Sequence, residues 1–68
     1  MKKLVIELSD EQYQTLKTEI SKGMKINFDE ETFSGFSITL SVIEGNLSWL
    51  EFEMYGQTNL GDVDWRFE

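Results

Sequence analysis

Residues 36–55 read FSITLSVIEGNLSWLEFEMY and decide the fold, because apolar and polar side chains alternate on both sides of one short turn. Successive side chains of a strand point to opposite faces, so this alternation predicts two strands with one buried face each. The residues between them, Glu44-Gly45-Asn46, are typical of a hairpin turn, since Gly and Asn tolerate a positive φ. The stretch therefore predicts an antiparallel hairpin.

The same alternation assigns the hairpin side chains to an inner and an outer face. The inner set is Phe36, Ile38, Leu40, Val42, Leu50, Phe52 and Met54, and the outer set of the second strand is Trp49, Glu51, Glu53 and Tyr55. Residues 56–61, with Gly at both ends, are expected to form a loop. A last strand is expected to turn Val63, Trp65 and Phe67 inward and Asp62, Asp64, Arg66 and Glu68 outward.

The N-terminal part predicts a strand followed by a helix. Leu4, Ile6 and Leu8 share one face of the expected strand, with Lys3, Val5 and Glu7 on the other, and Ser9 with Gln12 matches a capping box. A stripe of Tyr13, Leu16 and Ile20 indicates a helix over about residues 10–22. Gly23 is the expected helix end, and Ile26 and Phe28 would then belong to a short strand with their side chains inward.

These elements predict a single α+β domain over residues 1–68 with the order β-α-β-β-β-β. One helix would pack on a mainly antiparallel, strongly twisted sheet. A helix about 10 Å wide covers only two or three strands spaced about 4.8 Å apart, so five strands leave apolar surface uncovered. We therefore expect a homodimer; the alternative is a monomer whose sheet curls around the helix.

The composition excludes several classes of active site. The chain has 68 residues and no Cys or His, which excludes thiolate and imidazole ligands and Ser-His or Cys-His catalytic pairs. A chain this short can hardly build a substrate cleft, so no enzyme activity, no catalytic residue, no metal and no cofactor are expected. No apolar run suits a signal peptide or a membrane span, which favours a cytoplasmic protein that does not bind membranes.

The net charge of −7 is unevenly distributed. Residues 1–25 hold five lysines and four carboxylates, whereas residues 26–68 hold one arginine and nine carboxylates. The acidic part would repel a nucleic acid backbone, so direct nucleic acid binding is not expected. It would attract a basic protein surface.

The outer face of the last two strands is the expected partner-binding site. If these strands form a hairpin, the face combines Trp49, Glu51, Glu53, Tyr55, Asp62 and Asp64. Alternate strand residues lie about 6.6–6.8 Å apart, similar to successive phosphates of a nucleic acid, so the carboxylates could imitate phosphates. The alternative is a solvated acidic face that only keeps a small protein soluble.

The favoured function is a non-enzymatic interaction module that binds a basic protein surface. Inhibitors of nucleic-acid enzymes, immunity proteins and phage counter-defence proteins share this physical profile by analogy. One alternative is an assembly subunit that acts through its own copies. Another is a small ligand- or metal-binding regulator, for which Asn59, Asp62 and Asp64 would supply oxygen ligands, although their spacing does not match an EF-hand.

Overall fold

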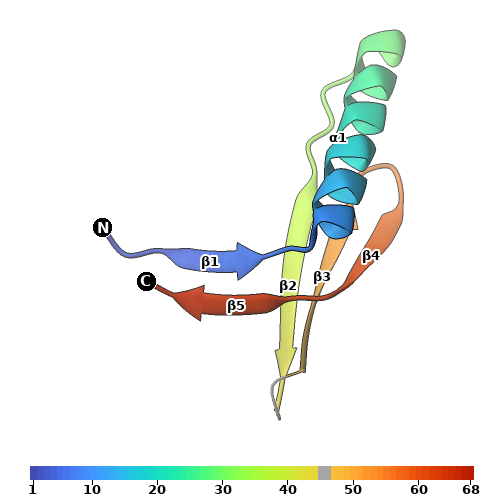
Figure 1. Ribbon diagram of the computed structural model, residues 1–68. Helices are drawn as coiled ribbons and strands as arrows, with labels where there is room; N and C mark the ends of the chain where they lie inside the picture. The colour runs from blue at the N-terminus through green and yellow to red at the C-terminus, as the bar shows by residue number, and fades with distance from the viewer. Residues whose placement is uncertain (45–46) are drawn as a thin grey trace.

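The computed structural model describes residues 1–44 and 47–68, and these parts contain one helix and five strands (Figure 1). The elements are β1 (Leu4–Glu7), α1 (Asp10–Glu30), β2 (Ser37–Ile43), β3 (Leu47–Glu53), β4 (Gln57–Asp62) and β5 (Asp64–Phe67). The α+β class and the order β-α-β-β-β-β are confirmed. The expected turn residues Gly45 and Asn46 lie outside the described residues, while Ile43 and Leu47 on either side of them are paired.

The strands form two antiparallel sheets instead of the single sheet expected. One sheet has the order β2-β3-β4, and the other is a ribbon of β1 and β5. Figure 1 shows this ribbon crossing the three-stranded sheet, with both termini at the same end of the ribbon. The condition set for the partner-binding face, a hairpin of the last two expected strands, is not met, because β5 pairs with β1 and Lys3 exchanges backbone hydrogen bonds with Glu68.

The helix is longer than the sequence pattern predicts. Ser9 and Gln12 form the expected capping box at its start. Gly23 does not end the helix but lies buried inside it, and the chain leaves the helix only at Glu31, which has a left-handed φ of 55°. The short strand expected around Ile26 and Phe28 is therefore helical, and Phe28 is exposed to solvent.

The expected loop at residues 56–61 is mostly strand β4, which pairs along β3. The chain reverses at Tyr55 and Gly56, both with positive φ, so the turn is shorter than predicted. A bulge opposite Leu50 and Glu51 allows β4 to continue, and Gly61 nearby has a φ of +91°. As a result Leu60 enters the core.

The core lies between the three-stranded sheet, α1 and the ribbon. Its buried apolar residues are Leu50, Phe52, Met54, Leu60 and Val63, with Ile6, Leu8, Leu16, Ile20 and Leu40 packed against them. Seven other residues expected to face inward are exposed: Leu4, Tyr13, Phe28, Phe36, Ile38, Val42 and Phe67. For Phe36, Ile38 and Val42 the reason is that α1 lies closest to β4, at one side of the sheet, and leaves β2 on the other side largely uncovered. Leu4 and Phe67 lie at the ends of β1 and β5 that are next to the termini, and Tyr13 and Phe28 lie on α1.

Candidate functional site

The outer face of the three-stranded sheet brings together four of the six residues expected to bind a partner. Trp49, Glu51 and Glu53 alternate along β3 and point away from the buried side chains between them. Asp62 on β4 lies opposite Trp49, so it belongs to the same face. The helix and the ribbon pack on the inner face with Leu50 and Phe52, which leaves the outer face uncovered by any described element.

Glu51 is held in place at the centre of this face. The indole Nε1 of Trp49 donates to Glu51 Oε1 at 2.9 Å, and the amide Nε2 of Gln57 donates to Glu51 Oε2 at 2.8 Å. Trp49 and Glu51 are both half-buried. The two donors fix the carboxylate without neutralising its charge, so Glu51 is oriented while its charge remains available to a partner.

No basic residue lies on the three strands of this sheet. The described ion pairs of the chain join Lys22 to Glu19 and Arg66 to Glu7 and Glu68, all outside the outer face. The β2 positions opposite the β3 acids are hydroxyl residues, with Thr39 facing Glu51. The outer face is therefore a row of carboxylates bordered by neutral polar side chains.

The structure separates Asp64 and Tyr55 from this group. Asp64 lies on β5 in the second sheet, opposite Glu7 of β1. Tyr55 lies in the turn after β3, where its hydroxyl donates to Asn27 Oδ1 near the end of α1 and lies 3.0 Å from the Thr32 hydroxyl. Tyr55 thus connects the sheet to the helix end.

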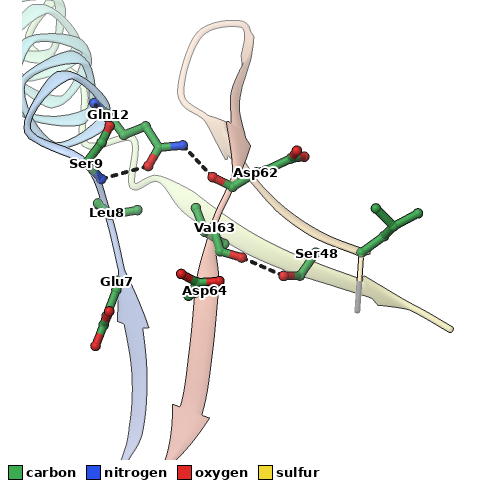
Figure 2. A pocket seen from close by; sticks show the side chains of 9 residues that line it. Glu7, Leu8, Ser9, Gln12, Ser48, Asp62, Val63 and Asp64 are labelled. Atoms are coloured by element: carbon green, nitrogen blue, oxygen red, sulfur yellow. Dashed lines mark hydrogen bonds between the residues drawn. The ribbon is translucent and has the colours of Figure 1, made fainter. Parts of the chain in front are cut away.

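A second candidate is a cavity of about 410 Å³ where the ribbon leaves the three-stranded sheet (Figure 2). It is lined by Glu7, Leu8, Ser9, Gln12, Leu47, Ser48, Asp62, Val63 and Asp64. Two of its neutral polar side chains, Gln12 and Ser48, already form hydrogen bonds with the backbone. Gln12 Nε2 donates to the carbonyl oxygens of Leu60 and Asp62 at 2.9 and 2.7 Å, and Ser48 Oγ donates to that of Val63 at 2.6 Å.

The carboxylates at the cavity do not converge on one point. Figure 2 shows the Asp62 side chain pointing away from Gln12, and Glu7 is paired with Arg66. Within residues 1–44 and 47–68, no three acidic side chains are grouped as a metal ion would require. Asn59, considered above as a calcium ligand, accepts a hydrogen bond from the Gly61 amide at 2.8 Å within its own strand. The cavity is therefore a weaker candidate than the outer face.

Sequence reasoning missed two glutamines that organise both candidates. The sequence pattern predicts a capping role for Gln12, and in the structure its amide also bonds β4. The glycines at both ends of residues 56–61 predict a loop for Gln57, whereas in the structure its amide bonds Glu51 from β4. The available signal was the choice of Gln at position 12, because Glu would complete a capping box equally well but cannot donate to a carbonyl.

Comparisons with protein-family models, with curated proteins and with solved structures found no match. In the part of the chain that the structure describes, no helix has both the length and the apolar character needed to cross a membrane.

Proposed function

We propose that the protein is a non-enzymatic interaction module that binds a basic protein surface through the outer face of its β2-β3-β4 sheet. The observation that carries the proposal is the oriented carboxylate of Glu51, bonded by Trp49 and Gln57 and placed beside the exposed Glu53. Tryptophan is one of the residue types that dominate binding energy at protein interfaces.

The geometry suits a partner that normally contacts phosphates. Glu51 and Glu53 are alternate residues of one strand, so their Cα atoms are separated by about 6.6–6.8 Å. Arginine and lysine side chains arranged to bind successive phosphates could bind these carboxylates instead, because both anions accept charge-assisted hydrogen bonds. An inhibitor of a nucleic-acid-binding protein is one function of this kind.

A charge-matched pair of variants tests which acids bind. Glu53→Lys with Asp62→Lys changes two exposed positions of the outer face, and Asp29→Lys with Glu30→Lys makes the same charge change at the end of α1. Each protein is titrated with an arginine-rich peptide, and binding is monitored by the backbone NMR chemical shifts. In the wild type and in the helix variant, the shifts of residues on β3 and β4 should change. The outer-face variant should bind at least about tenfold more weakly, equivalent to about 1.4 kcal/mol.

The same variants identify a cellular partner at low salt. A partner retained by the wild type and the helix variant but lost by the outer-face variant would support the proposal, especially if binding weakens with added salt. The proposal would be contradicted if both variants bound the peptide with equal affinity. It would also be contradicted if the peptide changed the NMR chemical shifts of acidic residues throughout the chain and not mainly those of β3 and β4.

A further inference from the structure

Strand β2 is an open edge of the three-stranded sheet. In the order β2-β3-β4 it pairs only with β3, over its whole length from Ser37 to Ile43. The backbone N–H and C=O groups on its other side are unpaired within the sheet, and such an edge is a template for another strand. Proteins commonly protect an edge of this kind with charged side chains, proline or a very short strand. This seven-residue strand has none of these.

The absence of charge on β2 distinguishes it from the other strands. Its sequence is SITLSVI, whereas β1, β3, β4 and β5 each carry at least one carboxylate. Two copies of a chain with net charge −7 repel each other. Of the five described strands, β2 is the one along which two copies can meet without bringing carboxylates of the paired strands together.

The inner face next to this edge is also apolar and uncovered. Phe36, Ile38 and Val42 are 42%, 45% and 46% exposed, although the strand pattern directs them towards the core. Leu40 between them is half-buried. A second β2 beside the first would extend the sheet and cover these side chains from the open side.

The dimensions of the chain agree with a missing partner. Its accessible surface is 5450 Å², compared with about 4450 Å² expected for a compact monomer of 8.0 kDa. The excess of about 1000 Å² is comparable to the roughly 800 Å² that one partner buries in a standard interface. The radius of gyration of 13.7 Å likewise exceeds the roughly 11 Å of a compact domain of this length.

We propose that two copies of the chain pair antiparallel along β2, with the two-fold axis at Leu40. Leu40 is the central residue of Ser37–Ile43, so this register pairs the complete strand. Ile38 then lies opposite Val42 of the other copy, and Leu40 lies opposite itself. On the outer face Thr39 lies opposite Ser41 of the other copy.

The proposed register pairs apolar residues on the inner face and hydroxyl residues at the centre of the outer face, with Ser37 opposite Ile43 at each end. The inner face gains apolar cross-strand pairs, and at its centre the outer face gains a hydroxyl pair of the kind that stabilises antiparallel strands. The axis is perpendicular to the sheet, so the result is a continuous six-stranded sheet with both helices on the same side. In each copy, Glu51 and Glu53 lie on β3, one strand away from the junction. The interface therefore does not depend on whether the outer face binds a partner.

Sedimentation equilibrium of matched variants tests the interface. The wild type should have twice the chain mass of 8.0 kDa at about 100 µM. Ile38→Lys places an ammonium group at the junction and should return the mass to that of one chain. Phe67→Lys, which makes the same change on the exposed tip of the ribbon, should leave the dimer intact, as should Glu53→Lys with Asp62→Lys. A wild-type mass of 8.0 kDa, or a dimer lost only in Phe67→Lys, would overturn the proposal.

A cysteine at the axis tests the register, because the chain contains no other cysteine. Directly opposed residues in an antiparallel pair have Cα atoms about 4.5–5.5 Å apart, within the range that a disulfide spans. Leu40→Cys should therefore form a covalent dimer on mild oxidation. Ser37→Cys should not, because its two copies lie at opposite ends of the paired strands. Cross-linking of Ser37→Cys with none for Leu40→Cys would contradict the register.

Discussion

Met54, directly after β3, packs its thioether against Gly23 in the middle of α1. A Cβ added to Gly23 would overlap the Met54 side chain, and both residues are buried. Gly23 therefore allows the helix to approach the sheet closely, which explains why a glycine is buried inside a continuous helix of 21 residues.

Gly23→Ala should destabilise the protein. Alanine favours a helix by about 1 kcal/mol over glycine, but here its methyl group would displace Met54 from a packed core at a cost of about 1–3 kcal/mol. Urea unfolding of the variant should therefore show a lower midpoint. Ser21→Ala, at an exposed position two residues away, should raise the midpoint slightly. A stabilised Gly23→Ala would show that the Met54 side chain can move aside at little cost, and that this contact does not require glycine.

Gln12→Glu should destabilise the chain although the capping box would remain possible. The new carboxylate could still accept from the Ser9 amide, but it would lose both donations to Leu60 and Asp62 and would face their carbonyl oxygens. We expect a loss of about 1–3 kcal/mol in the free energy of unfolding. Gln14→Glu makes the same charge change at an exposed helix position and should cost less than about 0.5 kcal/mol. Similar losses in both variants would contradict the role of the Gln12 amide.

The sequence pattern predicted those features that depend on local alternation or local capping. The inner residues of β3 are buried as expected because period 2 is a property of the strand itself. Gly23 misled the prediction because glycine both ends helices and permits close packing, and the residue that decides between these roles, Met54, is distant in sequence.

The candidate site shows the same limit. Trp49, Glu51 and Glu53 share a face because they alternate on one strand, so their grouping was predictable. Asp62 and Asp64 also alternate, but the chain passes from one sheet to the other at Val63, between them. Their separation depends on the pairing of β5 with β1, which joins the two ends of the chain and has no local signal.

Tyr55→Phe should lower the free energy of unfolding by about 0.5–1.5 kcal/mol, the usual contribution of one hydrogen bond. The lost hydroxyl bonds Asn27 and joins the turn after β3 to the end of α1. The suitable control is Tyr13→Phe, because the exposed Tyr13 ring instead lies 5.3 Å from the Lys17 ammonium group. Thermal unfolding should show a larger decrease for Tyr55→Phe. Tyr55 and Tyr13 are similarly exposed, so equal effects would show that the hydrogen bond of the Tyr55 hydroxyl to Asn27 contributes no stability.

Gln57 provides a test of the charge on the outer face that needs no partner. Its side chain donates to Glu51, and Glu53 lies directly opposite on β3. Gln57→Glu would add a third carboxylate and should lower the free energy of unfolding by up to about 1 kcal/mol, since like charges on opposed strands repel. Gln57→Lys keeps a donor and adds a cation, so it should stabilise the fold by a similar or smaller amount.

The difference in stability between Gln57→Glu and Gln57→Lys should shrink between about 0.01 M and 1 M salt, because the Debye length falls from about 30 Å to 3 Å. Urea unfolding midpoints at the two salt concentrations measure this difference in stability. If the difference does not change with salt, Glu51 and Glu53 do not generate the negative potential on which the proposed recognition of a basic surface depends.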